Sequence, residues 1–161
     1  MDSREYEQIV KDNIDTIYRI ALSHTRTTAD ADDVVQQTFM KLLTKSVRFN
    51  DEEHVKKWLI RVCVNECNSI FSSFWRRNVL SISEIPEDVV FEDRKNTALY
   101  EAIRELPAKY RVIVYLFYYE GYATKEISEI INIKEATVRT RLVTARKMLR
   151  AKLKEAWEDE E

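Results

Sequence analysis

The scarcity of helix-breaking residues is the feature that most limits what this chain can fold into. Its 161 residues include one glycine, Gly121, and two prolines, Pro86 and Pro107. Because glycine and proline interrupt regular backbone, their scarcity allows long helices and excludes a glycine-rich phosphate loop. The run 112–119 (VIVYLFYY) has high strand propensity but is predicted to be helical, since no partner strand can be found and Pro107 suits a helix start. The sequence therefore predicts an all-α fold.

Apolar residues at helical spacing predict three helices in the first half of the chain. The first spans residues 3–24, and the second begins after Thr27, which has Asp30 three positions later as in a capping box. A third helix is expected to open at Asn50, with Glu53 three positions later. The residues predicted to face inward are Val35, Phe39, Leu42 and Leu43 in the second helix, and Val55, Trp58, Leu59, Val62, Cys63, Ile70 and Phe74 in the third. The acids Asp30, Asp32 and Asp33 suit the positive end of the second helix's dipole, which would explain them structurally.

The two cysteines raise the question of a metal site. Cys63 and Cys67 lie four positions apart, so a helix would place both thiols on one face. The two histidines, His24 and His54, are distant in sequence, and no Cys-x-x-Cys pair exists. Because cysteine is a common buried residue, we predict packed free thiols, with no metal and no cofactor.

Helical periodicity fails from about residue 78 to residue 95, where acids gather around Pro86. The acids are Glu84, Glu87, Asp88, Glu92 and Asp93. This composition predicts a flexible linker over 79–95 between two small helical domains, 1–78 and 96–161. In the second domain Asn96 is expected to cap a helix that buries Leu99, Ile103 and Leu106, and Gly121 to end the helix that follows.

Residues 124–149 read as a short helix capped by Thr124, a sharp turn at Asn132, and a second helix. The second helix has an apolar stripe of Val138, Leu142, Ala145, Leu149 and Leu153. Its other faces are basic, with Lys134, Arg139, Arg141, Arg146, Lys147, Arg150, Lys152 and Lys154 against the single acid Glu135. An amphipathic hairpin with a solvated charged face would have the same pattern. The short first helix, the tight turn and threonines among the arginines favour a DNA-binding helix-turn-helix.

The basic face divides by position along the helix. Side chains near the N-terminal half would reach base edges, and those further along would meet phosphates. The predicted base readers are Thr137, Arg139, Thr140, Val143 and Thr144, and the predicted phosphate contacts are Arg146 and Lys147, with Arg141 suited to either role.

A second basic surface is predicted on the third helix. It exposes Lys56, Lys57, Arg61 and Asn65, and it ends in Phe74, Trp75, Arg76 and Arg77. Aromatic residues among arginines are typical of surfaces that bind single-stranded nucleic acid. Taken alone, Trp58 and Trp75 are more typical of a core.

Three motifs together resemble the extracytoplasmic-function sigma factors, small two-domain specificity subunits of bacterial RNA polymerase. They are residues 30–39 (DADDVVQQTF); residues 58–62 (WLIRV) with Asn65; and a third set of Leu106, Pro107, Arg111, Gly121, Glu126, Ile127, the run 137–142 (TVRTRL), Ala145 and Arg146. Departures from the family pattern are Asn132 in place of glycine, Lys134 in place of a capping serine, and Ala136 in place of glycine. The missing cap should cost the second helix about 1 kcal/mol unless another group, such as Glu135, compensates.

The resemblance implies roles for each motif. The first would dock on the β′ clamp helices of polymerase through Asp32, Asp33, Val35, Gln36, Gln37 and Phe39. The second would melt the promoter and hold a flipped base of the minus-ten element, through Lys56, Trp58, Arg61, Asn65, Arg76 and Arg77. The third would read the minus-thirty-five element. The implied partners are core polymerase, including its β flap, promoter DNA and an anti-sigma factor, and the linker acids would either mimic nucleic acid or serve as a tether.

Other classes fit the chain less well. A free-standing helix-turn-helix regulator would leave the first half of the chain without a role. An enzyme is also a poor fit. The sequence shows no nucleophile with a base, no paired carboxylates in an apolar setting and no phosphate loop. No apolar run is long enough to span a membrane, and the first residues lack a signal peptide's apolar core, so we expect a cytoplasmic protein.

Overall fold

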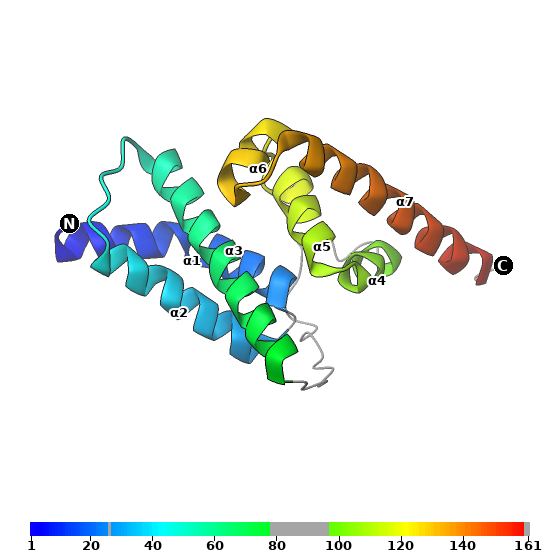
Figure 1. Ribbon diagram of the computed structural model, residues 1–161, viewed down its shortest axis with the longest axis horizontal. Helices are drawn as coiled ribbons and strands as arrows, with labels where there is room; N and C mark the ends of the chain where they lie inside the picture. The colour runs from blue at the N-terminus through cyan, green and yellow to red at the C-terminus, as the bar shows by residue number, and fades with distance from the viewer. Residues whose placement is uncertain (26, 78–96, 160–161) are drawn as a thin grey trace. The chain divides into compact units, whose positions relative to one another are not determined.

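The computed structural model describes residues 1–25, 27–77 and 97–159, with backbone alone for 71–77, 97, 100 and 156–159 (Figure 1). Its elements are α1 (Ser3–Thr25), α2 (Thr28–Thr44), α3 (Glu52–Arg77), α4 (Thr97–Glu105), α5 (Ala108–Val114), the π-helical turn η1 (Tyr115–Tyr119), α6 (Thr124–Ile131) and α7 (Glu135–Asp159). None of these described residues forms a strand, which confirms the predicted all-α fold.

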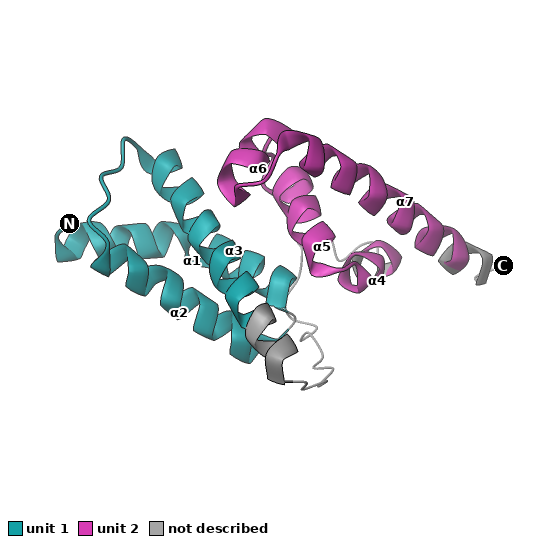
Figure 2. Cartoon of the chain, viewed as in Figure 1, with its two compact units in different colours: residues 1–89 teal, residues 90–161 magenta. Residues whose placement is uncertain are grey.

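The chain divides into two compact units, residues 1–89 and 90–161 (Figure 2). The predicted linker, 79–95, lies outside the described residues, and so does the expected cap Asn96. The exact domain limits therefore stay a prediction.

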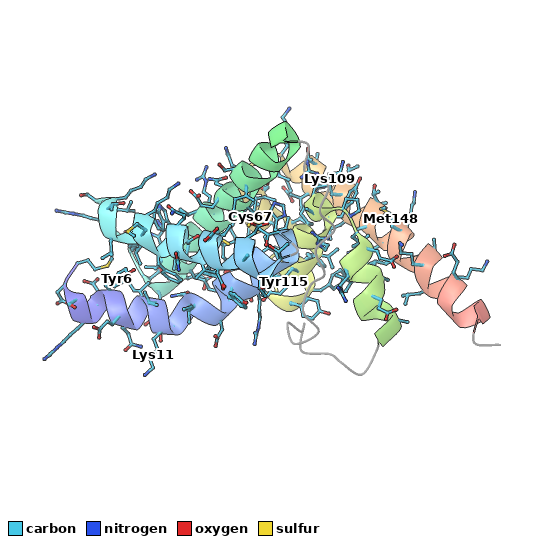
Figure 3. The ribbon with its side chains drawn as sticks, turned by 90° about the horizontal axis from the view of Figure 1, so that it is seen from below. Tyr6, Lys11, Cys67, Lys109, Tyr115 and Met148 are labelled. Carbon is cyan, nitrogen blue, oxygen red and sulfur yellow. The ribbon has the colours of Figure 1, made fainter. Side chains whose placement is uncertain are left out.

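The first unit is a bundle in which α1, α2 and α3 each pack against the other two. Its core contains Ile17, Ile20, Leu22, Val34, Phe39, Leu59, Ile60 and Cys63. Polar contacts also join the helices: Tyr6 Oη donates to the Phe39 carbonyl at 3.2 Å, Cys63 Sγ donates to the Ile17 carbonyl at 3.7 Å, and Lys41 pairs with Glu66. Both cysteines are buried free thiols, as predicted, and Cys67 is labelled in Figure 3.

Two local predictions for this unit are wrong. Leu43 was expected inside, but 58% of it is exposed, because the buried stripe of α2 instead continues through Thr38. Thr38 can be fully buried because its hydroxyl donates to the Val34 carbonyl at 2.7 Å within the same helix. At the start of α3 the cap is Asp51, not Asn50: its carboxylate accepts the His54 N–H at 2.7 Å. The Thr27 cap of α2 is confirmed, since its hydroxyl accepts the Asp30 N–H at 3.0 Å.

The second unit is built around α7, which packs against α4, α5 and α6. The core includes the predicted Ile103 of α4, Leu106 directly after that helix, and the apolar stripe of α7 from Val138 to Leu149. Arg111 is buried among them at 1% exposure. Its guanidinium donates to the carbonyls of Arg104 and Leu106 at 3.1 and 2.9 Å, so it closes the C-terminal end of α4.

The helical prediction for 112–119 is confirmed, with a distortion that the sequence did not reveal. The segment begins as α5 and widens into η1, where the Glu120 N–H bonds to the Tyr115 carbonyl at 3.2 Å. Gly121 then adopts φ of +74°, a left-handed conformation that glycine reaches without steric cost, and the helix ends as predicted.

The predicted helix-turn-helix is formed by α6 and α7. Asn132 adopts the left-handed conformation expected of it, with φ 56° and ψ 52°. The N-cap of α6 is Ala123 rather than Thr124; since alanine has no acceptor, only half a capping box forms, in which Glu126 accepts the Ala123 N–H at 3.2 Å. Thr124 instead donates to the Glu135 carboxylate at 3.1 Å, which ties the start of α6 to the start of α7.

Candidate nucleic-acid interface

The solvent face of α7 gathers most of the residues that the sequence assigned to DNA. Val138, Leu142 and Ala145 are buried, so the opposite side of the helix is fixed outward. Of the predicted residues, Arg139, Thr140, Val143, Arg146 and Lys147 are exposed, and Thr137, Arg141 and Thr144 are half-buried. One helix therefore presents hydroxyls and cations side by side.

A shallow groove of about 350 Å³ runs along one edge of this face. It is lined by Ala136, Thr137, Thr140, Arg141 and Thr144 of α7 and by Lys109 and Tyr110 of α5. The ammonium of Lys109, labelled in Figure 3, lies 5.0 Å from the Tyr110 ring centre. Sequence reasoning missed Lys109 and Tyr110, because nothing in the local pattern of α5 places them beside α7. The groove joins two cations and three threonine hydroxyls, of which that of Thr140 already donates to the Ala136 carbonyl at 2.9 Å. The two cations and the other two hydroxyls can donate to phosphate oxygens.

Arg139 is held by an ion pair at the start of its own helix. Its guanidinium lies 3.1 Å from the Glu135 carboxylate, four positions earlier, and the arginine side chain is 63% exposed. Such an exposed pair contributes only about 0.2–0.5 kcal/mol. Arg139 can therefore leave Glu135 for another partner at small cost.

Arg146 lies against aromatic residues of η1. Its Nε–H donates to the Tyr118 hydroxyl at 2.7 Å, and its guanidinium lies 5.6 Å from the Phe117 ring centre. The sequence predicted a solvated phosphate contact here and gave no sign of these partners.

On α3 the predicted residues Trp58, Arg61 and Asn65 follow one another at steps of three and four, so they lie on one side of the helix. Arg61 and Asn65 are exposed, whereas Lys56 and Trp58 are half-buried. The Trp58 ring meets Phe49 edge to face at 5.6 Å between ring centres, which holds the indole while leaving part of it accessible. The side chains of Arg76 and Arg77 lie outside the described residues.

The polar edge predicted on α2 is exposed at Asp32, Asp33, Gln36 and Gln37. Val35 and Phe39, assigned to the same surface, are buried at 9% and 5% exposure, so they hold α2 in the bundle instead of facing outward. The pKa of the half-buried Tyr18 phenol is raised, mainly by burial and to a smaller extent by the nearby Asp32 carboxylate. Met40 and Leu43, at 54% and 58% exposure, extend the exposed face of Gln36 by steps of four and three. Sequence reasoning had given Met40 no role.

Metal-binding clusters and membrane-spanning helices are both absent from the described residues. Within them no group of three or more histidine, cysteine or acidic side chains is placed to hold a metal ion. The helices that the structure describes include none with the length and apolar content needed to cross a membrane.

Comparison with known proteins agrees with this architecture. Residues 9–78 match the family model for sigma-70 region 2, and residues 96–149 match that for sigma-70 region 4. The chain is 31% identical over 150 residues to the RNA polymerase sigma factor SigV of Bacillus subtilis, covering 89% of this chain and 88% of the relative. It is 31% identical over 148 residues to the ECF sigma factor SigL of Mycobacterium tuberculosis, covering 86% and 83%.

A solved structure has the same fold. The sigma factor RpoE of Bartonella quintana, crystallised with the anti-sigma factor NepR, matches with a TM-score of 0.75 at 22% identity, covering 94% of this chain and 98% of that one.

Two helical units, the second with a basic helix-turn-helix, define a two-domain DNA-binding protein of the transcription machinery. The sequence relatives make the class specific: the chain belongs to the extracytoplasmic-function group of the sigma-70 family. The resemblance stated from the motifs is thereby confirmed. Members of this family are transcription factors and not enzymes.

Proposed function

We propose that the chain binds core RNA polymerase and directs it to promoters by reading minus-thirty-five DNA with α7 and minus-ten DNA with α3. The observation that carries the proposal is the exposed face of α7, where threonine hydroxyls and arginines stand together on a helix-turn-helix. We assign the two tasks to domains 1–78 and 96–161, joined by the linker 79–95. The chain would act in the cytoplasm as a binding subunit, and core polymerase would catalyse RNA synthesis.

In the second domain α7 would enter the major groove. Thr137, Arg139 and Thr140 stand near its N-terminal end, with Val143 and Thr144 one turn further, where side chains reach base edges. Arg146 and Lys147 lie beyond them and would contact phosphates. Arg141, for which either role was open, lines the groove with Lys109, and this position favours a phosphate contact.

In the first domain α3 would hold the separated strand. Trp58 offers a partly exposed ring for stacking, and Asn65 stands two turns along the same side with amide groups that can pair with a base edge. Lys56, Arg61, Arg76 and Arg77 would follow the backbone of the strand.

Docking on polymerase would use the exposed face of α2. Asp32, Asp33, Gln36 and Gln37 would meet the β′ clamp helices, and the exposed Met40 and Leu43 supply apolar area beside them. Val35 and Phe39 would support this surface from inside. The second domain would meet the β flap, and because RpoE of Bartonella quintana is found with an anti-sigma factor, we propose such a regulator here as well.

Run-off transcription tests the proposal. Purified core polymerase with this chain should start transcription at a defined subset of a promoter library, and core polymerase alone should not. A free-standing regulator would bind DNA without polymerase and would direct no run-off product, an outcome that would refute our proposal.

A matched pair of variants tests the docking surface. Asp33→Lys with Gln37→Lys should weaken polymerase binding in a titration without loss of helical content. Asp12→Lys with Gln8→Lys makes the same charge change on the exposed side of α1, where the two wild-type side chains hydrogen-bond at 2.8 Å. Equal loss in both pairs would mean that overall charge, and not the α2 face, controls binding.

A further inference from the structure

The contact between Arg146 and η1 joins segments 28 positions apart in the sequence. Tyr118 is 52% exposed, and Arg146 is exposed as well, so the contact lies at the surface beside the proposed DNA-binding face. The Phe117 and Tyr118 rings meet edge to face, with centres 4.9 Å apart. The arginine guanidinium lies over both rings, 5.6 Å and 5.8 Å from their centres.

The hydrogen bond leaves the guanidinium suited to a second partner. The bond uses Nε–H, and a bidentate contact with a phosphate can be made by the two terminal NH2 groups. The hydrogen bond and the two ring contacts together reduce the number of rotamers open to the Arg146 side chain. Arginine otherwise loses considerable rotamer freedom when it is immobilised at an interface.

The turn that carries Tyr118 is unusual in itself. It lies in the π-helical segment Tyr115–Tyr119, and π-helical turns are frequently found at functional sites. Tyr115, by contrast, is buried in the same turn, and its hydroxyl donates to Glu120 at 3.1 Å. The segment is therefore anchored at one end and presents Tyr118 at the other.

We propose that Tyr118 is a positioning residue that holds Arg146 ready for a backbone phosphate of the minus-thirty-five duplex. This inference rests on the proposed function, because it needs α7 to lie on DNA. Tyr118 acts through Arg146: it supplies no sequence preference, and it lowers the entropy that Arg146 loses on binding.

The test uses polymerase holoenzyme and a duplex that it selects from a library randomised at the minus-thirty-five element. Tyr118→Phe removes one hydroxyl and should weaken binding about 2- to 10-fold, the effect of immobilising one long side chain. The loss should be equal for all selected sequences, with an unchanged salt slope because the number of phosphates contacted is the same. Arg146→Ala should reduce the salt slope by about one phosphate.

The double variant separates positioning from folding. In an Arg146→Ala background, Tyr118→Phe should have no further effect on binding. The control is Tyr119→Phe, which removes the hydroxyl of the neighbouring exposed tyrosine, whose ring stacks on Tyr115 at 5.6 Å. It should bind as wild type does, and thermal unfolding should show the three single variants to be folded.

Three results would overturn the inference. Unchanged binding by Tyr118→Phe would show that Arg146 needs no support, and an equal loss with and without Arg146 would show that Tyr118 stabilises the fold only. Tighter binding would mean that Tyr118 competes with the phosphate. If wild-type holoenzyme selects no minus-thirty-five sequence at all, the proposed function itself fails, which is a different result from selection that ignores Tyr118.

Discussion

Arg139 and Lys147 lie on the same helix but differ in what their removal should change. Arg139 is near the N-terminal end of α7 and pairs with the half-buried Glu135 carboxylate, whereas Lys147 is exposed two turns further along. Arginine can form a bidentate contact with guanine, and lysine acts on phosphate as a point charge. Position and chemistry together are the grounds on which we propose that Arg139 reads sequence and that Lys147 contacts the backbone.

The first prediction follows from this difference. Arg139→Ala should cost about 1–3 kcal/mol of binding and relax base preference at one or two positions of the minus-thirty-five element. Lys147→Ala should weaken all sequences about equally and reduce the salt slope by about one phosphate. Holoenzyme binding to a randomised library at two salt concentrations distinguishes the two effects. A uniform loss for Arg139→Ala, with base preference intact, would show that α7 sits differently in the groove.

The second prediction concerns the Cys63 thiol in the core of the first unit. Its contact with the Cys67 thiol, followed by burial, raises the pKa of Cys63 well above its usual value. Above about pH 8.5 the unfolded chain releases this proton while the native state retains it, so the free energy of unfolding should fall as pH rises. Below that pH this contribution to stability should be fully present.

Chemical denaturation between pH 7 and pH 10 measures this effect. Other groups also titrate in that range, so the comparison is with Cys63→Ala, whose stability should decline less steeply. Native Cys63 should also react with iodoacetamide far more slowly than the unfolded chain does. Equal slopes for the two proteins would contradict the assigned cause.

At the scale of an element, the turn between α6 and α7 fixes the orientation of the DNA-binding helix. Asn132 holds the left-handed conformation, and the next N–H, that of Ile133, bonds to the Ser128 carbonyl at 3.1 Å. Asparagine tolerates this conformation better than alanine, and glycine better still.

The third prediction is that Asn132→Ala lowers the free energy of unfolding by about 1 kcal/mol relative to Asn132→Gly. Hydrogen exchange at residues 124–149 should report the difference, because the two units can unfold separately. The matched control places alanine and glycine at Asn50, whose φ is not positive, and follows hydrogen exchange in α1 to α3 of the same unit; alanine should be tolerated there as well as glycine. The same ranking at both positions would remove the left-handed turn as the cause.

The helices and their buried faces could be predicted because they depend on spacing within short segments. The stripe from Val138 to Leu149, the Thr27 cap and the turn at Asn132 are all readable from neighbouring residues. The prediction for Leu43 was wrong because spacing alone does not show that Thr38 can be buried. The Thr38 hydroxyl is satisfied inside its own helix, so Thr38 takes the buried position. Local spacing therefore predicts which side of a helix is buried, but not which residues at the edge of that side are exposed.

The candidate site was predictable to the same extent. The exposure of Arg139, Thr140 and Lys147 could be predicted because they lie opposite an apolar stripe, whereas their DNA contacts stay a prediction. The Lys109 groove and the Tyr118 contact join residues of different elements, and the second also depends on the π-helical turn. No pattern within one element contains that information.

At the scale of the whole molecule, each unit has its own core. The buried residues of α1 to α3 pack within the first unit, and those of α4 to α7 pack around α7 in the second. Each unit should therefore fold alone and bind its own DNA element weakly. Joining them raises the effective concentration of the second contact once the first is made, which can strengthen binding by about 10²- to 10⁴-fold.

The last prediction separates this tethering effect from a chemical role of the linker. Residues 1–78 and 96–161, supplied as two separate chains at micromolar concentration, should each be helical but should direct little run-off transcription. A full chain in which 79–95 is replaced by a Gly/Ser sequence of equal length should recover most of the activity if the linker acts as a tether, because such a sequence keeps the reach but removes the acids. If the acids Glu84, Glu87 and Asp88 act on polymerase by mimicking nucleic acid, the Gly/Ser chain should instead stay well below wild type. A variant that keeps the natural linker but carries Gln and Asn at those three acids then isolates charge from length. Full activity of the separate chains would contradict the tethered division of labour, since two untethered domains would not gain from effective concentration.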